Sequence, residues 1–324
     1  MHHTPTLDPA ATLHFILNGR AGSQEQDDTR EAIESALAAS GRPGQLHVCE
    51  PAELPRVAAE CAALALQAHG AIVAVGGDGT INTVAQAAHA AGCTMGVIPR
   101  GTFNYFARTH GIQADPAEAM EQLLAALPRP VQVAAVNQQV FLVNASVGLY
   151  PDLLEDRESW KARFGRSQLV ALGAAAATLL RAQRQLTLQI ELDGTVRKLR
   201  TLTLFAGNNR LQLEQLGVLV SASESQRADN GRVTAIMLKP LGTLAMLGLM
   251  LRGAMGSLGE AEGIEHFEFQ RMVVQPPKVL RFGRMKVAFD GEVARMKPPL
   301  DFRVLPTPLW LLKPGMSPAA AAAV

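Results

Sequence analysis

The chain has 324 residues, of which 48% are hydrophobic and 18% charged, and its formal net charge is +1. This amount of apolar material predicts two domains, each with a core of its own. The near balance of acids and bases excludes broad electrostatic attraction to nucleic acid or to an anionic membrane.

Shorter features of the sequence exclude further classes of protein. No charge-free run reaches the roughly 20 residues that a membrane span needs, and the N-terminus lacks the pattern of a secretion signal. The three cysteines, Cys49, Cys61 and Cys93, show no paired spacing and have no histidines at metal-ligand intervals. We therefore expect them to be small buried hydrophobes in a reducing compartment.

The first half of the chain alternates strands and helices. Strands that are apolar throughout and separated by helices predict a parallel sheet covered on both faces. The expected strands are 13–18, 45–49, 71–75 and 95–98, and the expected helices are 29–39, 54–69, 81–91 and 102–110.

After about residue 130 the pattern becomes that of an antiparallel sheet, with polar and apolar residues alternating and short turns between strands. We expect a domain of the sandwich type, interrupted by helices at 167–181 and 241–251. Both helices are expected to pack on the sheet rather than to lie on a bilayer. The expected strands are 132–136, 139–145, 186–192, 197–205, 232–238, 267–274, 278–282 and 286–289.

The strongest chemical pattern is the glycine-rich run 76–80, which follows an apolar strand and precedes a helix. Glycine lets the backbone approach a ligand, and the N–H groups that begin a helix favour phosphate. Asp78, among these glycines, would hold Mg²⁺ through water or take a proton from an attacking hydroxyl. A tight turn with Asp78 as a helix cap is the alternative. The position of the glycine-rich run at the carboxyl end of a parallel strand favours a ligand site over this alternative.

Gly76-Gly77-Asp78-Gly79-Thr80 followed by Asn82 resembles the signature of the diacylglycerol kinase catalytic domain. This superfamily includes bacterial lipid kinases, sphingosine kinases and ceramide kinases. Further similar segments follow in the family's order, at 96–108, 205–208, 228–233 and 289–292. The resemblance extends from about residue 13 to 313.

The resemblance implies a fold of two domains. The first is a Rossmann-like parallel α/β domain, similar to that of phosphofructokinases and NAD kinases, and the second is an antiparallel β-sandwich, with a cleft between them. We expect the nucleotide-binding domain at 10–130, with 303–316 returning to it. The β-rich lipid-substrate domain is expected at 131–302 and a disordered tail at 317–324.

The resemblance also implies roles for single residues. Asp78 is expected to be catalytic together with Asp290 and Glu292 of the second domain, one of which would accept the proton of the lipid hydroxyl. Asp290-Gly291 as an ordinary hairpin turn is the alternative. The residues implied in binding the phosphates and ribose of ATP are Asn18, Gly76, Gly77, Gly79, Thr80, Gly101, Thr102 and Asn104.

Three positions depart from the family's pattern. Gly19 replaces the usual proline after Asn18, and Tyr105 stands where many members have aspartate. Asn230 stands where bacterial members hold a structural divalent ion with aspartate. Because asparagine is a weaker ligand for a hard cation, we expect that metal site to be weak or empty.

The sequence thus predicts an ATP-dependent lipid kinase that uses Mg²⁺ to transfer the γ-phosphoryl group to a diacylglycerol-like hydroxyl. We expect it to be cytoplasmic, peripherally bound to the membrane that holds its lipid, and without a nucleic-acid partner. An NAD kinase-like enzyme shares the glycine loop and stays an alternative, as does a non-catalytic nucleotide- or lipid-binding regulatory protein. The identity of the lipid and the presence of a homodimer are left open.

Overall fold

The computed structural model describes residues 4–19, 23–149, 151, 186–192, 194–215, 231–239, 264–276 and 283–314. The chain divides into two compact units. The α/β unit comprises Met1–Val133 and Pro306–Val324, and the sandwich unit comprises Ala134–Leu305.

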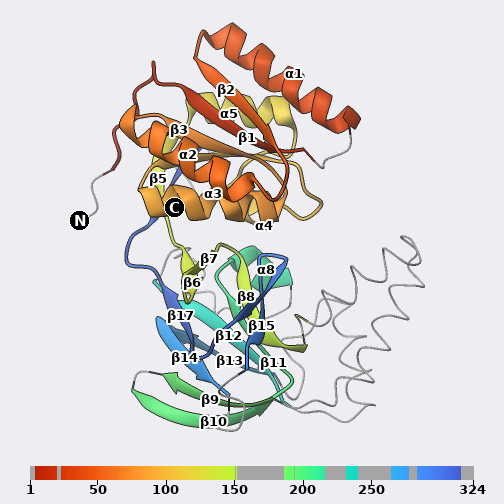
Figure 1. Cartoon of the computed structure of the whole chain (residues 1–324), viewed down its shortest axis with the longest axis vertical. Coiled ribbons are helices and arrows are strands. Elements are labelled where there is room, and N and C mark those ends of the chain that lie inside the picture. The colour runs from red at the N-terminus through yellow and green to blue at the C-terminus, as the bar shows by residue number, and fades with distance from the viewer. Residues whose placement is uncertain are drawn as a thin grey trace, which may run out of the picture. The chain divides into compact units, whose positions relative to one another are not determined.

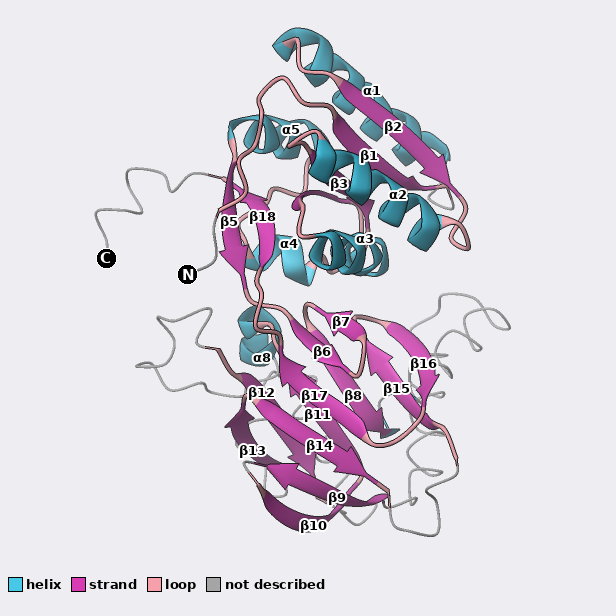
Figure 2. Ribbon diagram, turned by 60° about the vertical axis from the view of Figure 1, so that its left-hand side comes forward, coloured by secondary structure: helices cyan, strands magenta, loops and turns pink. Residues whose placement is uncertain are grey.

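The α/β unit is built on one six-stranded sheet of order β2-β1-β3-β4-β18-β5 (Figures 1 and 2). Its first five strands run parallel, and β5 is antiparallel to β18. The strands are β1 (Leu13–Asn18), β2 (Gly44–Cys49), β3 (Ala71–Gly76), β4 (Thr94–Pro99), β5 (Leu127–Val131) and β18 (Leu309–Lys313). The helices are α1 (Ser23–Ser40), α2 (Leu54–Gln67), α3 (Asp78–Ala91), α4 (Tyr105–Thr109) and α5 (Pro116–Ala125).

Helices cover both faces of this sheet. α1 and α5 pack on one face, where Leu37 and Leu123 reach the strands beside Phe15 and Val73, while α2 and α3 pack together on the other face. All residues of β3 and β4 are buried as a result. The predicted parallel sheet with continuous apolar strands is therefore confirmed, and its physical cause is burial on two sides.

The sandwich unit consists of two six-stranded antiparallel sheets, of order β10-β9-β14-β17-β6-β7 and β13-β12-β11-β8-β15-β16. Inward-facing side chains of both sheets, such as Phe141, Phe302, Val147 and Val287, form one buried core between them. The strands are β6 (Ala134–Val136), β7 (Gln139–Phe141), β8 (Asn144–Gly148), β9 (Leu186–Leu192), β10 (Thr195–Thr201), β11 (Thr203–Gly207), β12 (Val233–Leu238), β13 (Ile264–Phe269), β14 (Arg271–Gln275), β15 (Met285–Phe289), β16 (Glu292–Met296) and β17 (Leu300–Val304). One short helix, α8 (Arg210–Gln215), follows β11.

Three strands predicted as continuous are each two strands. The predicted strands 139–145, 197–205 and 267–274 contain β7 and β8, β10 and β11, and β13 and β14. In every case the chain leaves one sheet and enters the other between the two strands, at 142–143, at Leu202 and at Gln270. None of these corners contains a glycine or a proline, so the sequence does not mark the change of sheet.

Some expectations fall outside the described residues, namely the helices 167–181 and 241–251, the strand 278–282, the tail 317–324 and the metal position Asn230. Among the described helices, none is long and apolar enough to cross a membrane.

Candidate functional site

The glycine-rich run lies at the junction of β3 and α3. Gly76 ends the strand, Gly77 is the N-cap of the helix with φ −80° and ψ −177°, and Asp78 is the first helical residue. The side chain of Asp78 makes no capping hydrogen bond to α3. The alternative in which Asp78 serves as the cap of its own helix is therefore wrong.

Asp78 instead faces the start of α4. Its carboxylate accepts backbone N–H groups from Phe106, Asn104 and Tyr105, and its Oδ1 is buried without a hydrogen-bond partner among the described residues. Burial raises the pKa of Asp78 above its ordinary value, and the three N–H groups oppose that rise. A buried carboxylate oxygen that lacks a donor fits a cation, or a water held by one, better than it fits a bare phosphate.

Asn104 closes the turn that follows β4. Its Oδ1 accepts the N–H of Gly101 at 2.8 Å, and its Nδ2 donates to the carbonyl of Gly101 at 2.7 Å. Asn104 itself has a left-handed backbone, with φ 47°. Because of this closed turn α4 begins at Tyr105, so the expected helix at 102–110 is too long. The Asn104 side chain shapes the loop, while Thr102 is exposed.

The two glycine turns touch through their backbones. A Cβ added to Gly101 would lie 2.9 Å from the Cα of Gly77 and 2.7 Å from Oδ1 of Asn104. The N–H of Arg100 also donates to the carbonyl of Gly76 at 2.9 Å. Only glycine permits this approach, which leaves one continuous backbone surface at the carboxyl ends of β3 and β4.

This surface continues to the neighbouring strand. β1 lies beside β3 in parallel, and Asn18 is its last residue. Asn18, the run 76–80 and Gly101 therefore lie at the same edge of the sheet, where open α/β sheets bind ligands. The residues expected to bind nucleotide thus follow or end β1, β3 and β4 at this edge, and their role in binding stays a prediction.

We expect Gly101→Ala to disrupt this surface, because the added methyl group would overlap both Gly77 and Asn104. The two turns must move apart, so nucleotide affinity should fall about 10-fold or more, with a loss of stability of about 1–3 kcal/mol. Calorimetric titration with ATP and thermal unfolding would measure the two effects. Wild-type affinity in this variant would show that the contact between the turns does not shape the binding surface.

Asp290 occupies a buried position in the sandwich unit. Its side chain accepts the N–H of Leu142 at 2.7 Å on Oδ2, and those of Val143 and Asn144 at 2.8 and 2.9 Å on Oδ1. The residue is 5% exposed. Asp290 thus fixes the corner where the chain passes from β7 to β8, which favours a positioning role over proton transfer.

Glu292 differs from Asp290 in its surroundings. Asp290 and Gly291 form the hairpin turn between β15 and β16, with φ values of 44° and 89°, so the hairpin-turn interpretation of this pair is confirmed. Glu292 is the first residue of β16 and is exposed. Of the two carboxylates, Glu292 is the one accessible to a substrate.

The sequence did not reveal a polar network around this corner. Asn208 donates through Nδ2 to the carbonyl of Leu142 at 3.1 Å, and Asn144 donates through Nδ2 to Gln212 at 3.0 Å. Oδ1 of Asn144 and Oγ of Ser146 are buried without a partner among the described residues. The glycine-asparagine turn at 207–208 was the only indication of this network in the sequence.

The predicted site residues therefore form two groups, one in each unit. The first group surrounds Asp78 in the α/β unit, and the second contains Asp290 and Glu292 in the sandwich unit. The described residues offer no test of the weak metal site at Asn230.

Comparisons with known proteins confirm the resemblance seen in the glycine loop. The family model described as the diacylglycerol kinase catalytic domain matches residues 12–136. A protein of Staphylococcus aureus (strain Mu3 / ATCC 700698) named "Putative lipid kinase" is 25% identical over 246 residues, which are 74% of this chain and 75% of the relative. The protein of the same name from strain Newman has the same identity and coverage.

Solved structures show the same fold. A "putative diacylglycerol kinase" from Bacillus anthracis str. Sterne superimposes with a TM-score of 0.69 at 22% identity, over 96% of this chain and 98% of its own. A second structure from this organism, described as a diacylglycerol kinase, has a TM-score of 0.65 at 19% identity, with the same coverage. At this sequence identity, the structural similarity shows the fold of the α/β unit and of the sandwich unit, and nothing about function.

Proposed function

We propose that this chain, which matches the diacylglycerol kinase catalytic domain over residues 12–136, is an ATP-dependent lipid kinase that phosphorylates a diacylglycerol-like hydroxyl. The observation that carries the proposal is the joined pair of glycine turns at the carboxyl edge of the sheet, with the unpaired oxygen of Asp78 beside them. The relatives named as lipid kinases favour this hypothesis over the NAD kinase-like alternative.

The phosphates would lie on the surface formed by the two turns. The first N–H groups of α3 have no partner within the helix, and an anion at that end is favoured by the helix dipole. Mg²⁺, when bound, would neutralise charge that develops on the transferred phosphoryl group. Asp78 would hold it, directly or through water, because Asp78 Oδ1 is a buried anionic oxygen without a donor.

Acidification should weaken the binding of Mg²⁺ with ATP. Burial raises the pKa of Asp78, and a cation beside the carboxylate would lower that pKa again. Binding near the raised pKa therefore releases a proton, and affinity falls as the pH drops through that pKa. Calorimetry in buffers of different ionisation enthalpy would detect the proton. We expect Asp78→Asn to bind Mg²⁺ with ATP more weakly and without this proton release. If acidification leaves the affinity of the wild-type protein unchanged, Asp78 is not the group that holds Mg²⁺.

Glu292 is the proposed acceptor of the proton from the lipid hydroxyl. It is exposed, whereas the Asp290 carboxylate already accepts three backbone N–H groups. We expect Glu292→Gln to lower kcat about 100-fold or more, the usual contribution of a general base, with unchanged thermal unfolding. Glu191→Gln, at an exposed position on β9 of the same unit, is the matched control and should keep wild-type kcat.

One assay separates the candidate functions. The protein would be incubated with radiolabelled ATP, Mg²⁺ and mixed micelles of candidate lipids, or with NAD in place of lipid, and the products separated by chromatography. A labelled lipid supports the kinase proposal and names its substrate class. Labelled NAD phosphate would favour the NAD kinase-like enzyme, and bound ATP without turnover on any acceptor would favour a regulatory protein.

We further propose that the chain meets its lipid peripherally, at the cytoplasmic membrane surface.

A further inference from the structure

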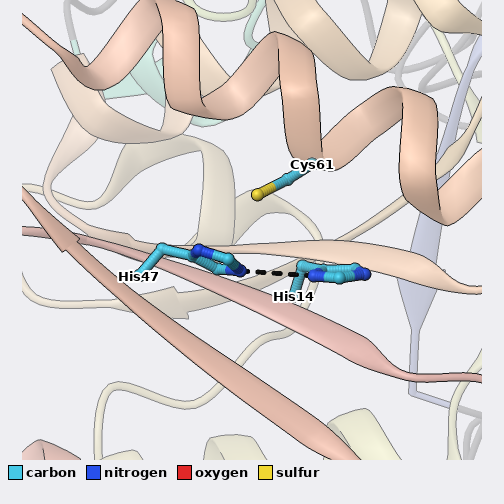
Figure 3. Close-up of side chains that lie close together, drawn as sticks. All are labelled: His14, His47 and Cys61. Atoms are coloured by element: carbon cyan, nitrogen blue, oxygen red, sulfur yellow. Dashed lines mark hydrogen bonds between the residues drawn. The ribbon is translucent and has the colours of Figure 1, made fainter.

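Three side chains that bind metals in other proteins converge away from the glycine turns. His14 comes from β1, His47 from β2 and Cys61 from α2, and their ligand atoms all lie within 4.8 Å of one another. Figure 3 shows Cys61 pointing from its helix toward the two rings, which are joined through Nδ1 of His14 and Nε2 of His47 at 3.2 Å.

The strand register produces this convergence. His14 pairs with Gln45 on β2, and His47 lies two residues further along that strand. Because side chains two residues apart share a face, both histidines point to the face that α2 covers. Cys61 lies on the buried side of α2, between Ala58 and Ala62. The cluster is therefore built from three separate elements, each held in place by the core of the α/β unit.

The nitrogen spacing already suits a tetrahedral ion. Two imidazole nitrogens bound to one Zn²⁺ at about 2.05 Å lie about 3.3 Å apart, close to the separation seen between these rings. A zinc-bound thiolate would lie about 3.6 Å from each nitrogen, so Cys61 must move inward from a distance of at most 4.8 Å. A rotation of its side chain supplies a movement of this size.

The chemistry of the three donors selects the kind of ion. Imidazole nitrogen and thiolate are ligands for ions of borderline softness, whereas Mg²⁺ prefers oxygen. Burial lowers the pKa of both histidines, which leaves the rings neutral and able to donate lone pairs. Burial raises the pKa of Cys61 to about 11, which keeps the free thiol protonated, so an ion that binds the sulfur must displace that proton.

We propose that His14, His47 and Cys61 form a binding site for a divalent transition-metal ion such as Zn²⁺, with a fourth position left for water. His47 lies on β2, the edge strand of the sheet, and is the partly exposed member of the set, so the ion enters from that edge. The bound ion joins β2 and α2 to β1 and thereby stabilises the α/β unit. This site is separate from the glycine turns and does not depend on the proposed kinase activity.

The test measures metal binding by the full chain. Protein freed of metal with a chelator would be titrated with Zn²⁺ against a chromophoric competitor, and with Co²⁺ to detect the absorption band of a thiolate ligand. We expect one ion per chain, the thiolate band and a higher melting temperature with Zn²⁺. Cys61→Ala should weaken binding by more than about 100-fold, since even changes outside the direct ligands cost 10- to 100-fold.

Matched variants decide between a site and adventitious binding. Cys93→Ala removes a thiol that is as buried as Cys61, at 2% exposure each, and should leave zinc binding intact. His47→Gln changes the least buried of the three proposed ligands. It replaces Cys61→Ala in the zinc titration if Cys61→Ala does not fold. Less than one ion per chain in the wild-type protein at micromolar free Zn²⁺, or full binding by either folded ligand variant, would overturn the proposal.

Discussion

Asp78→Asn is expected to lower the rate of lipid phosphorylation about 100-fold or more. The variant should melt at the same temperature as the wild-type protein or at a higher one. The amide keeps the size of the side chain, and its oxygen can still accept the N–H groups of Asn104, Tyr105 and Phe106. What the variant loses is the negative charge on the buried Oδ1, the atom proposed to hold Mg²⁺.

The stability prediction follows from the direction of the pKa shift. The folded protein raises the pKa of Asp78 above the unfolded value of 3.8. The folded state therefore binds this proton more tightly than the unfolded state does, and protonation stabilises the fold. This stabilisation is complete below the pKa of the unfolded state and is lost as the pH rises through the pKa of the folded state. At neutral pH the buried charge opposes folding, and Asp78→Asn removes that charge.

Two companion variants make this result interpretable. Asp78→Ala also loses the acceptor for the start of α4, so it should be inactive and less stable than Asp78→Asn. Asp115→Asn is the control, because Asp115 likewise accepts backbone N–H groups at a helix start, from Ala117 and Glu118, but lies outside the site. Activity in Asp78→Asn equal to that of Asp115→Asn would rule out a catalytic role for the Asp78 charge.

Asp290→Ala is expected to destabilise the protein by roughly 3–5 kcal/mol, the largest loss among the substitutions proposed here. The substitution leaves the N–H groups of Leu142, Val143 and Asn144 without their acceptor in a buried corner. It also places alanine at a left-handed backbone position, where φ is 44°. Urea unfolding followed by circular dichroism would measure the effect.

The control for this prediction is Asp301→Ala in the same unit. The Asp301 carboxylate pairs with Arg271 and Arg303 near the surface, where ion pairs contribute at most about 1 kcal/mol. Equal losses in the two variants would show that the three N–H groups of the corner find other partners. Asp290→Asn, which tolerates the left-handed backbone and keeps one acceptor, should fall between wild type and Asp290→Ala.

Much of the α/β unit could be predicted from the sequence because its information is local. The run 71–76 is apolar at every position and is followed at once by glycines, which indicates a strand buried on both faces and a ligand loop at its end. The place of Asp78 at that junction followed from the same few residues. The match to the family model over residues 12–136 rests on this part of the chain.

The corners of the sandwich could not be predicted in this way. A period of two residues shows that a segment is a strand, but it does not show which of two packed sheets the strand joins. The break at Leu202 leaves β10 and β11 in different sheets, although polar and apolar residues alternate across it from Thr201 to Leu204. Pairing with partners far along the chain decides where such a break occurs.

The sequence alone thus determined the two fold classes, the glycine loop and the acids available for chemistry, because periodicity and short motifs encode them. The tertiary structure decided how those acids differ. Asp290 is fixed by three backbone N–H groups from a corner 146 to 148 residues earlier in the chain, whereas Glu292 stays exposed. It also decided that His14, His47 and Cys61 meet. Their spacing matches no metal motif, because strand register and the packing of α2 bring them together.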